Sequence, residues 1–186
     1  MNPQDTVKEI IALYVQHGHE AYGKQLSMLQ HMTQSAELAE AEGYDNEVVL
    51  AAFLHDIGHF LGAPPISTGT SKHDQLGADY LRKKGFSTRI TVLVGEHVEA
   101  KRYLTLVDPL YYQELSEASK KTLIQQGGRM SAEEAIAFEA SPYFELNLKL
   151  RRWDEASKDA TKTVSSLEKY ESLILKHLNA QLVPQA

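Results

Sequence analysis

Residues 54–60, LHDIGHF, place side chains capable of metal chemistry at the end of an apolar stretch. His55 and Asp56 are adjacent, and neighbouring side chains on a helix point about 100° apart, so both can face one cavity. The carboxylate can then lie between two cations while the imidazole binds one of them. Gly58 allows close backbone approach, and His59 lies one turn on from His55. A His-Asp pair also occurs without any function beside a helix end, so distant residues must complete a ligand set.

Further side chains of the same chemistry lie on separate predicted helices. They are His31, His73, His97 and Asp154. Each has an ordinary alternative, as a buried core histidine, as a polar residue near a helix end or, for Asp154, as a partner of Arg151 one turn earlier. With the His-Asp pair they make four imidazoles and two carboxylates, and the chain has no cysteine. One bridging carboxylate would let this set hold two first-row metal ions.

The elements that must position these side chains are predicted to be helices, because apolar residues recur at helical spacing along most of the chain. The predicted helices cover residues 6–16, 25–42, 46–54, 72–84, 88–100, 116–126, a short segment from 131, 142–158 and 164–178. Residues 61–71 contain Pro64-Pro65 and are expected to form a loop that could act as a lid. No convincing strand is present. The sequence therefore predicts an all-α fold, a helical bundle enclosing a dinuclear metal site.

Length and charge narrow the classes of function. The 186 residues are expected to form one domain, residues 1–186, and the net charge of −6 argues against non-specific nucleic-acid binding. There is no basic and apolar leader and no stretch of membrane-spanning length, so we expect a cytoplasmic protein with no membrane partner. No obligate protein partner is evident. An anionic substrate would need local cations. The candidates, which could equally be solvated surface residues, are Lys101, Arg102, Arg151 and Arg152.

Longer motifs carry a family resemblance. They are LHDIGH (54–59), HDQLGADYL (73–81), HVEAKRYL (97–104), SKKTLIQQGG (119–128) and RRWDE (151–155). His31, His55-Asp56 and Asp154 match the H…HD…D signature of the HD-domain superfamily, and His73 and His97 match the extra histidines of its two-metal members. More specifically, the chain resembles the mixed-valent diiron oxygenases that cleave organophosphonates, relatives of myo-inositol oxygenase. The match spans about residues 22–158.

The resemblance implies an activity and residue roles. One iron would be bound by His31, His55, Asp56 and Asp154, the second by His73 and His97, with Asp56 bridging a mixed-valent Fe(II)/Fe(III) pair. Dioxygen would be the co-substrate, and cleavage of the C–P bond of a small 1-hydroxyphosphonate would give a carboxylate and phosphate. The phosphonate group would be held by Lys101, Arg151, Ser119 and Thr122. His59 would lie beside the site, near the metal or the substrate.

The sequence departs from this family ahead of the first ligand histidine. Members that act on amino-hydroxyethylphosphonates have a Tyr and, three residues later, a Glu that recognises the cationic nitrogen. An ungapped alignment puts Ala21 and Lys24 at these positions, and a one-residue gap puts Tyr22 and Gln25 there. Because a lysine repels an ammonium group, we expect a substrate without an amine, such as hydroxymethylphosphonate or 1-hydroxyethylphosphonate. A carboxylate-bearing analogue fits if Lys24 points inward, whereas a solvent-facing Lys24 would say nothing about specificity.

Two other functions fit part of the pattern. Metal-dependent phosphohydrolases of the HD superfamily use similar ligands to activate water against a phosphate ester or nucleotide. A non-catalytic helical sensor could retain the site as a ligand pocket. The additional histidines and the phosphonate-pocket residues count against the phosphohydrolase, and the complete ligand set argues against the sensor.

Overall fold

The apolar run before His55 forms α3 (Asn46–Leu54), the central helix of a computed structural model that describes residues 2–22, 26–62 and 72–183. From its third residue onward α3 is apolar on all sides and buried, as expected of a helix enclosed by other elements. It packs against α2, α5, α9 and α10. The helix therefore carries His55 into the interior.

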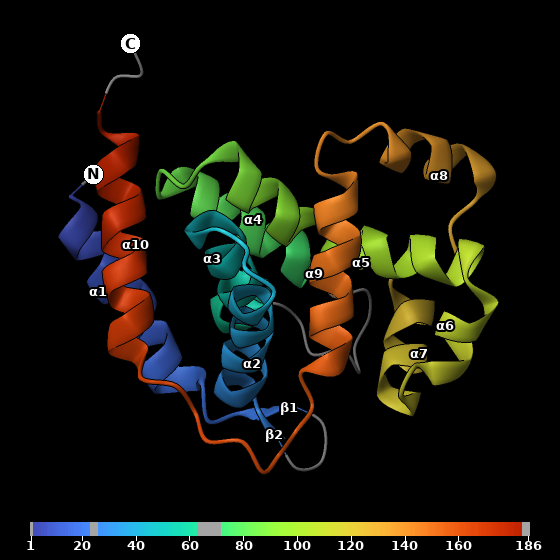
Figure 1. Cartoon of the computed structure of the whole chain (residues 1–186), viewed down its shortest axis with the longest axis horizontal. Coiled ribbons are helices and arrows are strands. Elements are labelled where there is room, and N and C mark those ends of the chain that lie inside the picture. Colours follow the sequence, from blue (N-terminus) through green and yellow to red (C-terminus); the bar gives the residue numbers. More distant parts are fainter. Residues whose placement is uncertain (1, 23–25, 63–71, 184–186) are drawn as a thin grey trace.

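The other elements are also almost all helices, which confirms the predicted all-α class (Figure 1). In chain order they are α1 (Pro3–His17), β1 (Ala21–Tyr22), β2 (Leu26–Ser27), α2 (Met28–Ala41), the 3-10 helix η1 (Ile57–Leu61), α4 (His73–Lys83), α5 (Thr88–Val107), α6 (Pro109–Glu114), α7 (Glu117–Gln125), α8 (Ala132–Glu139), α9 (Phe144–Ala156) and α10 (Leu167–Gln181). The first and last helices pack side by side, and α6, α7 and α8 lie at the opposite end of the molecule.

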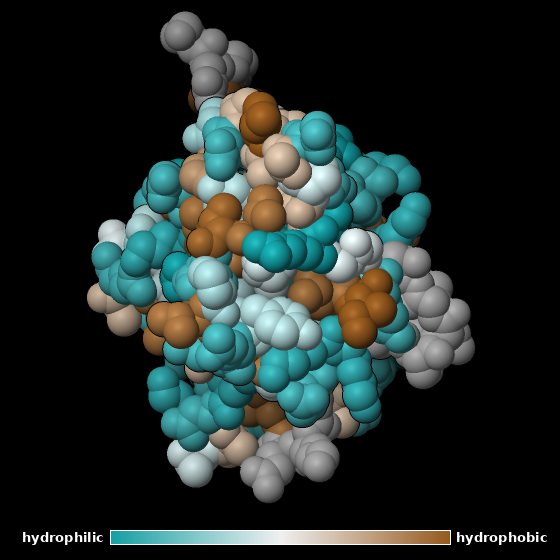
Figure 2. Space-filling view, turned by 90° about the vertical axis from the view of Figure 1, so that its right-hand side faces the viewer, coloured by the Kyte–Doolittle hydropathy of each residue, from teal (hydrophilic) through white to brown (hydrophobic). Residues whose placement is uncertain are grey.

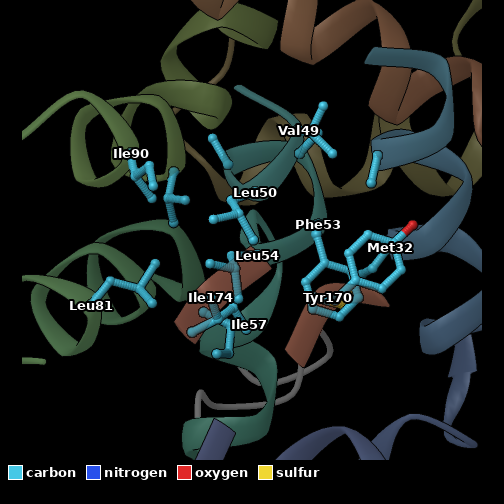
Figure 3. Packing of buried hydrophobic residues seen from close by; sticks show 14 of the residues in the cluster. Met32, Val49, Leu50, Phe53, Leu54, Ile57, Leu81, Ile90, Tyr170 and Ile174 are labelled. Carbon is cyan, nitrogen blue, oxygen red and sulfur yellow. The ribbon is translucent and has the colours of Figure 1, made fainter. Parts of the chain in front are cut away.

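The main core is built around α3 from aromatic and aliphatic side chains. Phe53 stacks on Tyr170 of α10 with ring centroids 3.9 Å apart (Figure 3). It also stacks on Tyr14 of α1, with ring centroids 4.3 Å apart. Leu50 and Leu54 lie beside Ile174 in the same cluster. The Tyr14 hydroxyl donates to the backbone carbonyl of Phe53 at 2.7 Å, which satisfies a polar group inside this apolar packing.

Two features differ from the sequence prediction. The helix predicted to end near residue 100 continues to Val107. Asp108 then separates it from α6, because the Asp108 Oδ1 accepts from the amides of Leu110 and Tyr111 and so caps the start of the next helix. Lys101 therefore lies one turn after His97 on a continuous helix. The short α6, with proline at its first position, was not predicted.

The second difference is a short antiparallel strand pair, β1 with β2, in a chain for which no strand was expected. Each strand has two residues, too few for an alternating pattern to be recognised. The pair brings Ser27 to the start of α2, where Ser27 and Gln30 form a capping box. The hairpin therefore fixes where α2, and with it His31, begins.

The remaining predictions concern the surface and the loops. Among the described residues, no helix is long and apolar enough to cross a membrane. Hydrophilic residues dominate the face that carries α6 and α8, with hydrophobic residues in small separate areas (Figure 2). Most of the predicted 61–71 loop lies outside the described residues. That residues 1–186 form one domain stays a prediction.

Candidate active site

His55 and Asp56 are held in the interior by the end of α3. His55 is the C-cap residue and Asp56 follows it, and their exposed fractions are 0% and 4%. The close approach predicted at Gly58 is present, because a Cβ at this position would lie 1.8 Å from the carbonyl oxygen of His73. Only a glycine lets η1 and the start of α4 pack this tightly. This contact brings His73 to Asp56.

The two oxygens of Asp56 face two different pairs of histidines. Oδ2 lies 3.6 Å from His31 Nε2 and 3.4 Å from His55 Nε2. Oδ1 lies 3.2 Å from His73 Nε2 and 3.6 Å from His97 Nε2. Within each pair the Nε2 atoms are 3.2 and 3.0 Å apart. Asp56 thus has the geometry of a carboxylate that bridges two cations.

Asp154 reaches the first histidine pair from α9. Its Oδ1 lies 3.3 Å from His31 Nε2 and 3.9 Å from His55 Nε2, and the residue is 3% exposed. We call these residues the metal cluster: His31, His55, Asp56, His73, His97 and Asp154. The cluster draws on α2, α3, α4, α5 and α9, so residues far apart in sequence meet only in the fold.

Backbone carbonyls orient three of the imidazoles. His31 Nδ1 lies 2.9 Å from the Ser157 carbonyl, His55 Nδ1 2.8 Å from that of Ala52, and His97 Nδ1 2.8 Å from that of Val94. A carbonyl oxygen only accepts, so each Nδ1 donates and each Nε2 keeps its ligand position toward the carboxylates. Nitrogen and carboxylate ligands without sulfur suit iron, manganese or zinc, so the residues present fit a first-row metal pair.

The electrostatics of the metal cluster also favour a cation. Burial opposes charge on His55, yet the carboxylates of Asp56 and Asp154 raise its pKa to about 9. Burial likewise opposes ionisation of Asp56, but the surrounding histidines hold its pKa well below the usual range. Two ionised, buried carboxylates therefore attract positive charge into the space between the imidazoles.

His59 and Tyr22 border the metal cluster. His59 Nε2 lies 3.9 Å from Asp56 Oδ1 and its ring stacks on His73, close enough for Asp56, His59 and His73 to share a cation. Burial and the nearby His73 lower the pKa of His59 to about 4. The Tyr22 hydroxyl donates to Asp154 Oδ1 at 3.3 Å, and its ring stacks on His31 at 3.7 Å. Tyr22 thus contacts His31 of the first histidine pair and Asp154. Lys24 and Gln25 lie outside the described residues.

A second cluster of polar groups lies beside the metal cluster on α5, α7 and α9. We call Lys101, Ser119, Thr122 and Arg151 the anion pocket. Lys101 Nζ donates to Thr122 Oγ1 at 2.6 Å and to Gln126 Oε1 at 3.0 Å. Burial and the nearby Arg151 guanidinium lower the pKa of Lys101 to about 7. A buried amine and a hydroxyl are thus held together, and none of the described carboxylates contacts the amine.

Arg151 links the anion pocket to the metal cluster. Its guanidinium pairs with Asp154 and with Glu155, and Nε donates to Tyr111 Oη at 2.6 Å. Ser119 Oγ donates to Glu155 Oε2 at 3.2 Å. Asp154 therefore does both things that the sequence allowed: it pairs with Arg151, and it belongs to the metal cluster. Arg102 instead pairs with Glu99 and Glu134, away from these groups.

Three residues of the anion pocket's surroundings were not predicted. Tyr111 lies on α6, which was not recognised as a helix. Gln126 and Glu155 fall inside the motifs quoted above, but nothing in their spacing shows that they contact Lys101 and Arg151. The quoted motifs SKKTLIQQGG and RRWDE contain the only sequence signal that could have identified these two residues.

Comparison with known proteins places this geometry in a family. Residues 28–140 match the HD domain. A [1-hydroxy-2-(trimethylamino)ethyl]phosphonate dioxygenase (glycine-betaine-forming) of Leisingera caerulea is 39% identical over 165 residues, covering 86% of this chain and 84% of the relative. A hydroxymethylphosphonate dioxygenase of Gimesia maris is 34% identical over 173 residues, covering 90% and 86%. An uncharacterized protein of Acanthamoeba polyphaga mimivirus is 43% identical over 179 residues, covering 93% and 82%.

The relatives cover 86–93% of the chain. The HD-domain match includes the whole of α3 and ends before Asp154. Two of the relatives are named as oxygenases of phosphonates, which agrees with the family that the motifs resemble. The chain belongs to the HD-domain family and, within it, to the phosphonate-cleaving oxygenases.

Proposed function

We propose that this protein is a diiron dioxygenase that cleaves the C–P bond of a small 1-hydroxyphosphonate. The observation that carries the proposal is Asp56, whose two oxygens each face a histidine pair. Asp154, which lies against the first pair, is one helical turn of α9 from Arg151 of the anion pocket. His31, His55, Asp56 and Asp154 would bind one iron. His73 and His97 would bind the other, with Asp56 shared. The products are a carboxylate and phosphate. The substrate supplies all the electrons that reduce dioxygen, so the reaction consumes no external reductant.

The protein's part in the reaction is to hold the phosphonate and aim C1. When bound, the iron pair, mixed-valent in the active form, supplies the redox chemistry that activates dioxygen. Lys101 and Arg151 provide cationic donors, and Ser119 and Thr122 provide hydroxyl donors. Because Arg151 is fixed against Asp154, a phosphonate held by Arg151 keeps its C1 next to the metal cluster. Lys101 and Arg151 are buried, which limits the competition of water for their charged groups, whereas Ser119 and Thr122 are half-buried.

The substrate that the sequence favours lacks an amine. The glutamate that would recognise a cationic nitrogen is replaced by Lys24, or by Gln25 if the alignment has a gap. Hydroxymethylphosphonate and 1-hydroxyethylphosphonate meet this requirement. The similarity to the hydroxymethylphosphonate dioxygenase of Gimesia maris supports the same choice.

A second candidate substrate carries a quaternary ammonium group, because the relative from Leisingera caerulea is named for a trimethylamino compound. Such a group has no N–H to donate and binds aromatic faces rather than a carboxylate. Tyr22 offers a phenol next to His31, although one face of its ring is already stacked on that imidazole. The described residues provide no carboxylate beside Tyr22 other than Asp154.

The test is oxygen uptake and phosphate release by the iron-loaded protein on matched substrates. Hydroxymethylphosphonate, 1-hydroxyethylphosphonate, an amino-hydroxyethyl analogue and its trimethylamino form differ mainly in the substituent on C1. We expect kcat/KM to be highest for an amine-free compound. The variants Lys24→Glu and Gln25→Glu distinguish the two alignments. The variant in which kcat/KM for the amine-bearing substrate rises identifies the residue that contacts the substituent on C1. Preference for a cationic substrate by the unmodified protein would refute the amine-free choice.

The same assay separates the oxygenase from a phosphohydrolase. Phosphate released from a phosphate ester or nucleotide without oxygen uptake would assign the metal cluster to water activation. The absence of oxygen uptake with all four phosphonates, in protein shown to contain two irons, would overturn the proposed function.

A further inference from the structure

Glu155 occupies the anion pocket with its own carboxylate. Its Oε2 accepts from Ser119 Oγ at 3.2 Å and pairs with Arg151 Nη2, while its Oε1 pairs with Lys158. Ser119 and Arg151 are two of the four residues to which phosphonate binding is assigned above. A protein carboxylate therefore satisfies donors that the phosphonate would use.

The contacts of Arg151 divide into fixed and exchangeable ones. Nε donates to Tyr111 and Nη1 to Asp154, and both partners are buried, at 4% and 3% exposed. Nη2 is paired with Glu155, whose side chain is 19% exposed. If Glu155 moves away, the guanidinium keeps its orientation through Tyr111 and Asp154, and Nη2 is free to face an anion. The geometry thus separates the groups that position Arg151 from the group that competes for it.

Lys158 offers the displaced carboxylate a partner nearer to solvent. Its Nζ already pairs with Glu155 Oε1, lies 3.5 Å from Ser119 Oγ, and belongs to a side chain that is 29% exposed. Glu155 can therefore leave Arg151 and Ser119 without losing every ionic contact. A short rotation toward Lys158 is sufficient, because the two residues are already in contact.

We propose that Glu155 is an internal competitor for the anion pocket, displaced toward Lys158 when a phosphonate binds and returning to Arg151 and Ser119 when phosphate leaves. The inference rests on the proposed function, since it assumes that the anion pocket holds the phosphonate. A tetrahedral dianion brings three oxygens to Lys101, Arg151 and the two hydroxyls, whereas the carboxylate contacts only Arg151 and Ser119 there. Glu155 is a positioning residue that sets affinity for both substrate and product.

The test is calorimetric titration of the full-length, iron-loaded protein with methylphosphonate and with inorganic phosphate, without oxygen. In Glu155→Gln, the competing charge is removed and the dissociation constants of both anions should fall by about tenfold. In Lys158→Met, the displaced carboxylate loses its partner, so both dissociation constants should rise by a few fold. Opposite signs for the two variants are the expected signature. Unchanged or weaker binding by Glu155→Gln would show that Glu155 supports the anion pocket instead of competing for it.

A third variant separates failure of this inference from failure of the proposed function. Lys101→Met should lose most binding of both anions if the anion pocket holds the phosphonate. If Lys101→Met binds them as tightly as the unmodified protein, or if the unmodified protein binds neither, the anion pocket is wrongly assigned and the inference falls with it. If Lys101→Met loses binding and Glu155→Gln does not gain it, only the role of Glu155 is refuted. Should Glu155→Gln not fold, tighter or unchanged binding by Lys158→Met refutes that role.

Discussion

The metal cluster and the anion pocket meet on α9, yet they are held in place in different ways. In the metal cluster, His31, His55 and His97 are fixed by backbone carbonyls of the helices and their ends. In the anion pocket, Lys101 and Arg151 are held by side chains. Backbone partners cannot move without moving a helix, whereas side-chain partners can rotate. The metal cluster is therefore held rigidly, whereas the side chains of the anion pocket can rotate.

The largest effect is expected from Asp56→Asn, which removes the charge shared by both histidine pairs. Loss of the bridging carboxylate should reduce iron content toward zero and lower kcat by about a thousandfold or more, since bound metal supplies several kcal/mol of stabilisation. Metal analysis and oxygen uptake measure both. Asp74→Asn is the matched control, because Asp74 is a buried acid beside His73 that is not part of the metal cluster. Two irons in Asp56→Asn would disprove the bridging role.

Gly58→Ala tests whether the close packing of η1 against α4 positions the second histidine pair, His73 and His97. The added methyl would meet the backbone of His73 and must push α4 away from η1. We expect iron content to fall from two toward one per chain and metal affinity at His73 and His97 to drop by about 10- to 100-fold.

Gly77→Ala provides a graded control for this change. Its added methyl would come no closer than 3.2 Å, first to a side-chain methyl of Ile57, so a smaller loss is expected. Metal titration of both variants gives the comparison. Equal losses would show that the closeness of η1 to His73 does not determine the second half of the metal cluster.

Lys101→Met separates the two regions, because it should affect substrate and leave the metal in place. KM for the phosphonate should rise about 30-fold or more, since losing one partner of a buried charged contact costs about 2 kcal/mol or more. Iron content should be unchanged. Lys121→Met, at an exposed position of α7, is the control and should match the unmodified protein. A loss of iron in Lys101→Met would contradict the division into two regions.

The smallest effect is a pH dependence of the anion pocket. With the pKa of Lys101 lowered to about 7, the amine is charged below that pH and neutral above it, so kcat/KM should fall as pH rises through about 7. The decline can reach about tenfold per pH unit. Lys101→Arg keeps the charge and should shift the decline to higher pH, while ionisation of the substrate is the same for both proteins. Identical profiles would exclude Lys101 as the titrating group.

The sequence predicts the metal cluster better than its surroundings. The sequence predicts a helix over residues 46–54, apolar along most of its length, with the His-Asp pair directly after it, and the structure has both features. The residue types suggested a carboxylate between two cations, and the family resemblance implied Asp56 as the bridge. Which histidines each Asp56 oxygen faces depends on the packing of several elements, so local spacing could not reveal it. The contact of Glu155 with Ser119 depends on how α7 packs against α9, and helical periodicity gives no information on that packing.

The helix boundaries show the same limit. Periodicity predicts most helices, but the continuation of α5 to Val107 and the start of α6 depend on one capping aspartate, Asp108. Because α6 was missed, Tyr111 and its contact with Arg151 were missed as well. The residue expected to read the substrate substituent, Lys24, lies outside the described residues, so its role rests on sequence and on the substrate assay alone.

The most direct test of the account is the ratio of phosphate released to oxygen consumed by protein loaded with two irons, with hydroxymethylphosphonate as substrate. Insertion of both oxygen atoms into the products requires one phosphate per dioxygen, and the account predicts a ratio of one that is lost in Asp56→Asn. Phosphate release that continues at the same rate without oxygen would contradict it and would assign the metal cluster to hydrolysis.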